Sequence, residues 1–311
     1  MLDVLNYVDQ RAANIINRVN QIKAETGDVP SLAILTSRVN SDANRSYIKS
    51  KCAFAEKVGM KCSVLYAEDY ESETRLKIEL RTFDGVIVQF PFKDLTFEQL
   101  QQYIDKLIPA TKDVDGLGSG KLFKPCTPLG IYNYLNHSIF DIQGELNAYF
   151  AEHEGPIHVH VIGYGGLVGK PMVELLLNDR RYTVSVSRSK TNDSTLTRLH
   201  DASDVIVCAT PVHNLIGREM YDSSKVYVDC GCNVVDGKLL GNVSRDVYGT
   251  GLSMITPVPN GVGRMTVLSL FENVLEAYDK YHIHYRDQDY ASKDNANLDK
   301  DFVMKLIKGE H

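Results

Sequence analysis

The chain has 311 residues and a formal net charge of −6 at neutral pH. That length is enough for two domains with separate hydrophobic cores. The acidic balance argues against a general nucleic-acid binder or a protein that adheres to anionic membranes. The longest apolar runs are no longer than a strand, so we expect no membrane span. The N-terminal MLDVLNYVDQ carries acids where a signal peptide carries bases, which favours a cytoplasmic protein.

The cysteines and histidines do not form a recognisable metal motif. Most of the six cysteines lie inside apolar runs, which predicts reduced core residues rather than disulfides. Cys230 and Cys232 are too close together for an ordinary zinc knuckle and have no second pair. His158 and His160 would share one face of a strand without a third ligand. We therefore expect no bound metal.

The first third of the chain alternates helical and strand patterns. Gly59 is placed to end a helix, and Pro91 to break a strand. Alternation of this kind predicts a small parallel α/β domain. The predicted helices cover Leu2–Thr26, the segment from the Asn40–Asn44 loop to about Val58, and Ser72–Arg81; the predicted strands cover Ser31–Leu35, Cys62–Tyr66 and Gly85–Phe90.

Four polar residues in this part of the chain are candidates for chemistry. Tyr47 and Lys51 are four residues apart and share one helix face. Gln89 ends an otherwise apolar strand, at the edge where open α/β sheets bind ligands. Asp115 lies in the polar turn Lys112–Gly116. Each also has an ordinary explanation, as an amphipathic pair, a strand end or a plain turn.

The stretch Ile157–Thr191 predicts a strand, a glycine turn, a helix and a second strand. Gly163 and Gly165 open a G-x-G-G-x-x-G spacing, which is not the strict dinucleotide fingerprint. Glycines at such a turn let a phosphate approach the backbone at a helix N-terminus. An ordinary βαβ unit with a glycine turn is the alternative.

The end of the second strand indicates which dinucleotide would bind. An NAD site usually places Asp or Glu there, to hold the ribose 2′-hydroxyl. Here the sequence is Ser187-Arg188-Ser189-Lys190, with two bases and no acid. Arg188 and Ser189 therefore favour the 2′-phosphate of NADP, and a solvated basic turn is the alternative.

The rest of the chain supplies connecting elements and further strands. Strands are predicted at Asp204–Thr210 and Val226–Gly231, each ending in small residues. The Pro- and Gly-rich loop Ile255–Thr266 would cost little further entropy to order around a ligand. A helix starting in Pro128–Asn136 should link the domains; it precedes an irregular insert at His137–Gly155, and a helix over Val267–Tyr281 precedes the polar tail from Arg286.

Seven motifs in order resemble one family, the bifunctional methylenetetrahydrofolate dehydrogenase/methenyltetrahydrofolate cyclohydrolases (FolD). The resemblance covers roughly residues 30–280, and seven motifs in register are far more specific than any one of them. The motifs are Tyr47-x-x-x-Lys51, Gly85–Pro91, Lys112–Gly116, Pro125–Pro128, Gly163 with Val168–Pro171, Ser189–Thr191, and Ile255–Pro259 with Gly261–Gly263 and Met265-Thr266.

The resemblance implies a homodimer of chains with two α/β domains around a cleft, the second a Rossmann-type dinucleotide-binding domain. The folate-binding catalytic domain would comprise 1–128 and 267–285, the NAD(P)-binding domain 129–266, and the tail 286–311. Lys51 would be the central catalytic group and Gln89 its support; Tyr47 would stack on the folate and Asp115 would hold the pterin. Pro259 and Gly263 would border the substrate, and Thr127, Gly163, Tyr164, Gly165, Arg188, Ser189, Cys230, Cys232 and Thr266 would line the cofactor.

This chain departs from the family pattern at several places. Tyr164 stands in the glycine turn where the family commonly has an arginine for the NADP 2′-phosphate, and Arg188 stands where a histidine is usual. Asn260 and Arg264 replace common Gly and Pro, and the segment after Gly116 is shortened. The prediction is NADP, with NAD as the alternative.

The resemblance implies oxidation of 5,10-methylenetetrahydrofolate and hydrolysis of the methenyl product to 10-formyltetrahydrofolate. An NAD-linked dehydrogenase without hydrolase activity, and a non-catalytic folate- or dinucleotide-binding relative, are the alternatives. An amino-acid or shikimate-type dehydrogenase would share the two-domain plan. That reading would leave Tyr47-x-x-x-Lys51 and the Pro-Val-Pro loop as coincidences.

Overall fold

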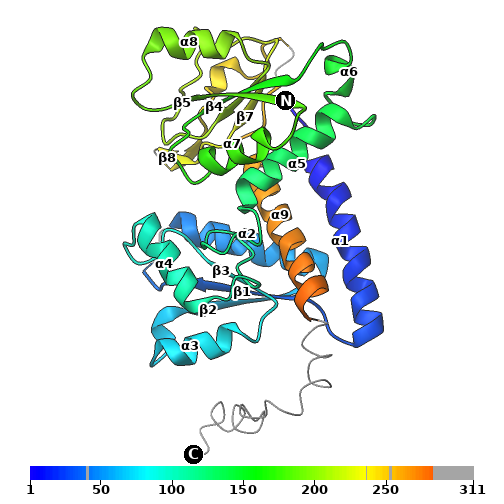
Figure 1. The fold of residues 1–311 in the computed structure, drawn as a ribbon, viewed down its shortest axis with the longest axis vertical. Coiled ribbons are helices and arrows are strands. Elements are labelled where there is room, and N and C mark those ends of the chain that lie inside the picture. The colour runs from blue at the N-terminus through cyan, green and yellow to red at the C-terminus, as the bar shows by residue number, and fades with distance from the viewer. Residues whose placement is uncertain (40–41, 236, 252–253, 283–311) are drawn as a thin grey trace, which may run out of the picture.

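The computed structural model describes residues 1–39, 42–235, 237–251 and 254–282; the side chains of 42 and 43 are outside this description. The chain forms two α/β lobes, one above the other in Figure 1, joined by long helices. The predicted tail from Arg286 lies outside the described residues. No helix in the described part has both the length and the apolar character needed to cross a bilayer.

The N-terminal lobe is built on a three-stranded parallel sheet in the order β2-β1-β3. One face packs against α3 and α4, through a cluster that includes Leu35, Leu80 and Leu100. The other face packs against α2 and the connecting helices. The elements are β1 (Ser31–Thr36), α2 (Asp42–Val58), β2 (Lys61–Tyr66), α3 (Glu73–Leu80), β3 (Gly85–Val88) and α4 (Phe97–Leu107).

The second lobe is built on a four-stranded parallel sheet in the order β5-β4-β6-β7. The chain leaves β4 in one direction for β5 and returns to the other side for β6, so the switch point of the sheet lies beside β4. An antiparallel hairpin follows β7. The elements are β4 (Ile157–Ile162), α7 (Gly169–Leu177), β5 (Tyr182–Ser187), α8 (Asp193–Asp201), β6 (Val205–Cys208), β7 (Val226–Asp229), β8 (Asn233–Val235) and β9 (Lys238–Leu240).

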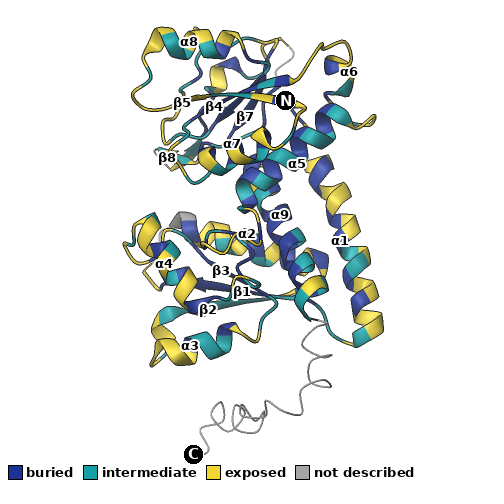
Figure 2. Ribbon diagram, viewed as in Figure 1, coloured by how far each residue is buried: buried dark blue, intermediate teal, exposed yellow. Residues whose placement is uncertain are grey.

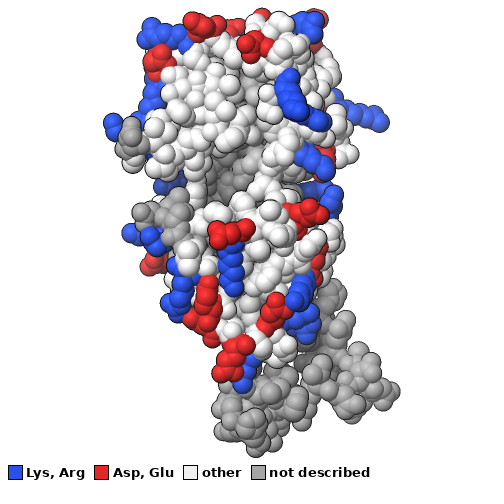
Figure 3. All heavy atoms as spheres, turned by 90° about the vertical axis from the view of Figure 1, so that its left-hand side faces the viewer, with Lys and Arg blue, Asp and Glu red and all other residues white. Residues whose placement is uncertain are grey.

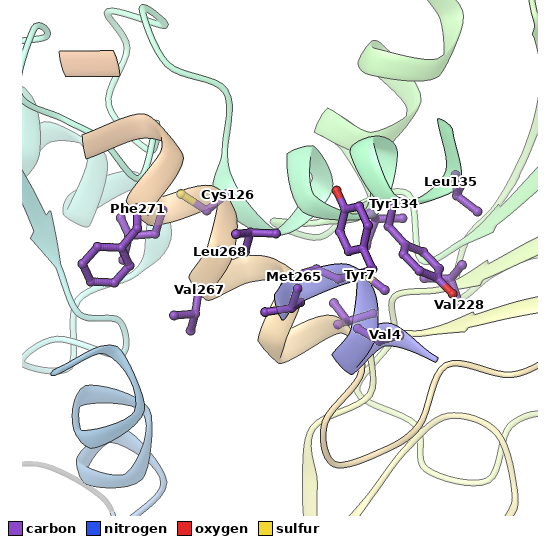
Figure 4. Packing of buried hydrophobic residues seen from close by; sticks show 14 of the residues in the cluster. Val4, Tyr7, Cys126, Tyr134, Leu135, Val228, Met265, Val267, Leu268 and Phe271 are labelled. Carbon is purple, nitrogen blue, oxygen red and sulfur yellow. The ribbon is translucent and has the colours of Figure 1, made fainter. Parts of the chain in front are cut away.

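Three helices join the lobes: α1 (Val4–Thr26), α5 (Cys126–Phe140) and α9 (Val262–Ala277). Figure 4 shows their packing, with Tyr7, Tyr134 and Met265 at the centre. One continuous cluster of buried residues runs from Ile34 in the first sheet, through these helices, to Val161 in the second. The buried residues form this central band in Figure 2, with exposed residues on the outer helices. Because the two sheets share a core, the helices hold the lobes in a defined relation.

The structure adds elements that the sequence reading did not include. Helix α4 begins with a capping box formed by Thr96 and Gln99, a helix-start signal that is also visible in the sequence. Helix α8 and the β8–β9 hairpin were also not predicted. The insert at 137–155 is not irregular throughout, because α5 continues to Phe140 and a short helix, α6 (Asn147–Phe150), follows. Most other predicted bounds agree within a few residues.

Helix α9 starts earlier than expected, at Val262 instead of Val267. The last five residues of the predicted loop at 255–266 are therefore helical. The predicted domain boundary at 266–267 falls inside this helix. Ile255 instead forms a parallel bridge with Tyr227, which extends the second sheet beyond β7.

The six cysteines are free thiols, and all but one lie in the core or pack against it while only partly buried, as Cys52, Cys62 and Cys230 do. Only Cys126 and Cys208 are fully buried, and Cys232 is exposed. His160 is buried and hydrogen-bonded to the Ser187 hydroxyl. Among the described residues no group of three or more potential metal ligands comes together.

Candidate active site between the lobes

Lys51 and Gln89 form the buried centre of the site. Lys51 lies on α2 and Gln89 directly after β3, and their side chains are 8% and 7% exposed. The Lys51 amine donates a 2.7 Å hydrogen bond from Nζ to Gln89 Oε1. The Gln89 amide is itself fixed, because its Nε2 donates to the Phe90 carbonyl at 3.0 Å. Lys51 and Gln89 are therefore in direct contact. The family resemblance predicts that the first is the catalytic group and the second its support.

The environment of Lys51 favours the neutral amine. Burial lowers its pKa, because a desolvated ammonium is disfavoured, and the nearby Asp115 carboxylate opposes that shift. Gln89 offers a neutral acceptor and so orients the amine without adding a charge. An amine with a lowered pKa gives up its proton more readily than an ordinary lysine, which suits general acid–base work.

The turn that carries Asp115 is held by side chains from two other parts of the chain. Asn273 on α9 donates from Nδ2 to the Val114 carbonyl at 2.9 Å and to the Lys124 carbonyl at 3.3 Å. The Cys126 thiol donates to the same Val114 carbonyl at 3.2 Å. Burial raises the pKa of Cys126, and the Asp115 carboxylate adds to this shift. Asp115 is therefore held near Lys51 by a fixed backbone.

Asp113, two residues before Asp115, also shapes this turn. Its side chain is buried and accepts a 2.7 Å hydrogen bond from the Gly118 N–H. Burial raises the pKa of Asp113 to about 6, and the backbone donors of the turn oppose the rise. Gly116 has a left-handed φ of 65°, and a Cβ there would lie 2.6 Å from the Phe123 carbonyl oxygen. The turn thus requires glycine at this position.

Tyr47 reaches across to the second lobe. Its hydroxyl contacts the thiol of Cys232, which follows β7. The Tyr47 side chain is 37% exposed, so part of its ring faces solvent. Burial raises the pKa of this phenol, and its contact with Cys232 adds to the rise. The contact brings helix α2 of the first lobe against the loop after β7 of the second, and Figure 3 shows the surface hollowed between the lobes.

The glycine turn lies on the second-lobe side of this space. Gly163 has a φ of 102°, and a Cβ there would lie 2.2 Å from the Ala209 carbonyl oxygen. A Cβ on Gly165 would meet nothing within 4 Å. The Gly163 and Tyr164 N–H groups donate to the Ser187 carbonyl, which joins the turn to the end of β5. Gly163 is therefore needed by the fold, whereas Gly165 keeps backbone open for a ligand.

Helix α7 begins at this turn without a side-chain cap. The uncapped N-terminus of a helix attracts phosphate groups through its N–H groups and its dipole. Arg188 lies beside the turn, its guanidinium 4.8 Å from the centroid of the Tyr164 ring. Ser189 next to it is exposed. These features together fit a dinucleotide that carries an extra phosphate.

Comparison with known proteins agrees with this geometry. Residues 125–282 match the family model described as "Tetrahydrofolate dehydrogenase/cyclohydrolase, NAD(P)-binding domain". The chain is 35% identical over 294 residues to the "Bifunctional protein FolD" of Macrococcus caseolyticus, covering 89% of this chain and 96% of that one. The chain belongs to the tetrahydrofolate dehydrogenase/cyclohydrolase family.

A second sequence relative and a solved structure are also similar to this chain over most of its length. The FolD protein of Streptococcus mutans is 33% identical over 281 residues, covering 85% of this chain and 92% of that one. A crystal structure of the bifunctional FolD enzyme of Campylobacter jejuni matches with a TM-score of 0.72 at 29% identity, covering 89% and 97% of the two chains. The two-lobed α/β fold expected from the sequence is thereby confirmed.

The departures from the family pattern contact one another in two pairs in this structure. The Arg188 guanidinium stacks on the Tyr164 ring. Tyr164 replaces the arginine that is usual in the family, and it thereby holds a different arginine beside the turn. Arg264 donates to the Asn260 side chain at 3.2–3.3 Å. Asn260 has a φ of 78°, a left-handed conformation that asparagine adopts more readily than most residues.

The remaining predicted residues are less closely connected to Lys51. Thr266 on α9 donates to the Thr127 hydroxyl at 3.1 Å, so these two residues lie together. Pro259 and Gly263 lie exposed on either side of the start of α9. Cys230 follows β7, and burial raises the pKa of its thiol.

The sequence reading missed several residues that support the site. Asn273 and Asp113 hold the Asp115 turn, and neither was singled out. A signal for Asn273 was available, because it is a lone amide among Leu270, Phe271 and Val274 on a helix face that must be buried. No comparable signal marked Asp113, which resembles any turn aspartate.

Proposed function

We propose that this protein oxidises 5,10-methylenetetrahydrofolate with NADP and hydrolyses the methenyl product to 10-formyltetrahydrofolate. The observation that carries the proposal is the desolvated Lys51 amine, which is held by Gln89 near Asp115 in the lobe opposite the dinucleotide-type turn. Relatives that share about a third of their residues with nearly the whole chain are named as bifunctional FolD proteins, which supports both activities.

The residues at the glycine turn fit an NAD(P) dinucleotide. The open backbone at Gly165 and the uncapped start of α7 suit its pyrophosphate. Arg188 and Ser189 suit a 2′-phosphate, and no acid ends β5 to hold an unmodified ribose. When bound, the nicotinamide accepts a hydride. We infer a preference for NADP from Arg188, although Tyr164 in place of the usual arginine favours NAD as the alternative.

The oxidation step requires position above all. Loss of a hydride from the methylene carbon leaves a cationic methenyl bridge between two nitrogens of the folate. Hydride transfer needs the donor carbon within contact distance of the acceptor, which two lobes with a shared core can provide. In this proposal Tyr47 stacks on the folate, and Pro259 and Gly263 border it. Thr127, Cys230, Cys232 and Thr266 line the nicotinamide side.

The hydrolysis step requires a proton relay, and Lys51 supplies it. The neutral amine takes a proton from water as the water oxygen bonds to the methenyl carbon, which discharges the cation. The resulting ammonium gives the proton to the departing ring nitrogen as the carbon–nitrogen bond breaks. The remaining hydroxyl proton is released to solvent, which leaves the formyl group on the other nitrogen. A cationic substrate beside Lys51 disfavours a second positive charge and so further favours the neutral amine.

Asp115 suits recognition of the pterin. A carboxylate accepts two hydrogen bonds from the donor-rich edge of a 2-amino-4-oxopterin. Its backbone is fixed by Asn273 and the Val114 carbonyl, so little order is lost when the ring binds. In this proposal Asp115 also adjusts the protonation of Lys51, because its charge favours the ammonium.

We also propose the wider setting of the enzyme. The catalytic domain would comprise 1–128 with 267–285, and the NAD(P)-binding domain 129–266. The enzyme would act as a cytoplasmic homodimer on tetrahydrofolate derivatives, without nucleic-acid or membrane partners. A monomeric mass in solution would contradict the dimer.

The proposal is tested by a two-wavelength assay on 5,10-methylenetetrahydrofolate, with NADP and NAD offered in parallel. We expect reduced cofactor to form faster with NADP and no methenyl intermediate to accumulate. Methenyl accumulation with NAD as the better cofactor would support the NAD-linked dehydrogenase instead. Binding of folate or dinucleotide without turnover would identify a non-catalytic relative.

A further inference from the structure

A buried carboxylate outside the catalytic group organises the cofactor-side edge of the second sheet. Asp229 is the last residue of β7 and is 1% exposed. Its Oδ1 accepts hydrogen bonds from the Gly231 N–H at 2.8 Å and the Asn242 N–H at 2.7 Å. Its Oδ2 accepts from the Val243 N–H at 2.9 Å. One side chain thus joins the loop after β7 to the segment after β9.

Asn242 extends the network to the loop after β6. Its side chain is fully buried, and its Nδ2 donates to the carbonyl and the hydroxyl of Thr210, each at 3.0 Å, and to the Val212 carbonyl. The Asp229 N–H donates to the Thr256 hydroxyl at 2.8 Å. The side chains of Asp229 and Asn242 therefore hold three loops, and the Asp229 backbone holds the segment before the Pro-Val-Pro turn.

The packing around Asp229 leaves no room for adjustment. A Cβ on Gly241 would lie 2.0 Å from Asp229 Oδ2, and one on Gly231 would lie 2.4 Å from the Asn242 nitrogen. Burial raises the pKa of Asp229, and the three N–H donors oppose the rise. An amide in place of the carboxylate would turn an NH₂ group toward an N–H donor. Asp229→Asn therefore removes an acceptor without changing the size of the side chain.

The loops held in this way carry residues assigned to the nicotinamide side of the cleft. Cys230 follows Asp229 directly, and Cys232, two residues further on, contacts Tyr47 of the other lobe. We propose that Asp229 is a positioning residue for hydride transfer, which fixes the cofactor-side wall of the cleft through its three backbone hydrogen bonds. This inference rests on the proposed function. The inference predicts that oxidation is affected and hydrolysis is not, because the proposed hydrolysis depends on Lys51 in the other lobe.

The test compares Asp229→Asn with Asp204→Asn in the full-length protein. Asp204 is a matched control at the opposite edge of the same sheet, where its carboxylate accepts the His158 N–H at 2.8 Å. Oxidation is measured with methylenetetrahydrofolate and NADP, and hydrolysis with methenyltetrahydrofolate alone. We expect Asp229→Asn to lower kcat/KM for oxidation by about tenfold to a hundredfold, since small misplacements cost up to about 10²-fold. Hydrolysis should stay within about threefold, as should both activities of Asp204→Asn.

Two further readouts separate positioning from a general structural role. The deuterium isotope effect with dideuterated methylene substrate should rise in Asp229→Asn, because hydride transfer becomes slower relative to other steps. Thr210→Val removes one acceptor of Asn242 and should lower kcat/KM for oxidation by a smaller factor. This second variant keeps the test valid if Asp229→Asn does not fold.

The outcomes are distinct. Equal losses in oxidation and hydrolysis, or unchanged oxidation in both Asp229→Asn and Thr210→Val, would overturn the inference. A wild-type protein that catalyses neither reaction would instead contradict the proposed function.

Discussion

The two sides of the space between the lobes are built in different ways. On the N-terminal side, the groups proposed for catalysis are buried side chains whose positions are fixed by hydrogen bonds, as between Lys51 and Gln89. On the second side, the glycine turn offers open backbone at Gly165 and an exposed cation at Arg188. Burial shifts the pKa values of groups on the first side. The groups on the second side are exposed, which suits a ligand that must enter and leave. The two sides should therefore respond differently to substitution.

The largest effect is expected at Lys51. Lys51→Met removes the amine but keeps an apolar stem of similar length, and it should lower hydrolysis of methenyltetrahydrofolate by about 10²–10⁴-fold, the usual range for a lost acid–base group. Lys49→Met is the matched control, because Lys49 lies on the same helix and is exposed. If the hydrolysis rates of the two variants agree within a few-fold, Lys51 does not take part in the mechanism.

Arg188 should show its effect in cofactor choice. Arg188→Gln removes the cation stacked on Tyr164, and a lost charge-assisted hydrogen bond of about 1.5–3 kcal/mol corresponds to roughly tenfold or more in kcat/KM for NADP. The value for NAD should change little. Arg180→Gln, at the opposite end of β5 and also exposed, serves as the control. Equal losses with both cofactors would show that Arg188 does not read the 2′-phosphate.

Two glycines of the same turn should separate stability from binding. Gly163→Ala forces a Cβ into the Ala209 carbonyl at a left-handed φ, so it should lower the free energy of unfolding by about 1–3 kcal/mol. Gly165→Ala meets no neighbour and should leave the thermal midpoint unchanged while weakening cofactor binding. Thermal unfolding and dinucleotide titration measure the two effects. The assignment fails if Gly165→Ala binds the dinucleotide as tightly as the wild type.

The Asp115 turn can be loosened from a distance through α9. Asn273→Ala leaves the Val114 and Lys124 carbonyls without this donor and should lower the free energy of unfolding by about 1–3 kcal/mol. It should also raise KM for the folate substrate. Ser269→Ala lies one helical turn earlier and removes a buried hydroxyl that has no partner among the described residues, so it should be neutral or slightly stabilising. A folate KM unchanged in Asn273→Ala would separate this residue from the substrate site.

An effect of pH on stability, without a direct effect on the proposed chemistry, is expected in the second lobe. Burial lowers the pKa of His160 to about 4, below its usual value near 6.5. Between these values the unfolded chain binds the extra proton, so stability should fall as pH decreases from about 6.5 to 4, by up to about 3 kcal/mol. Chemical denaturation of the wild type and His160→Gln should show a shallower pH dependence in the variant. Parallel curves would exclude His160 as the source.

Local features of the fold were readable from the sequence. The glycine turn, the first two strands and the helix ended by Gly59 follow from residue patterns that act within a few positions. Helix α4 was readable in principle from Thr96 and Gln99. The hairpin of β8 and β9 has only three residues in each strand, which is too short for an alternating pattern to stand out.

The site itself depends on contacts that no local pattern contains. Lys51 and Gln89 could be paired only through a resemblance to a family, because 38 residues separate them. Asn273 lies 159 residues from Val114, and its role follows from the packing of α9 against the Asp115 turn. The Tyr47 contact with Cys232 depends on how the connecting helices orient the two lobes. Such relations come from the shared core and not from the motifs.

The most direct test of the central claim is the pH dependence of methenyltetrahydrofolate hydrolysis by the wild type and Gln89→Leu. The claim is that the buried Lys51 amine moves the proton and that Gln89 orients it. We expect kcat for the wild type to rise with the fraction of neutral amine, with an inflection below the ordinary lysine value of 10.5. Gln89→Leu should lower kcat and shift that inflection. A wild-type profile without a lysine inflection, or one that Gln89→Leu leaves unchanged, would contradict the account.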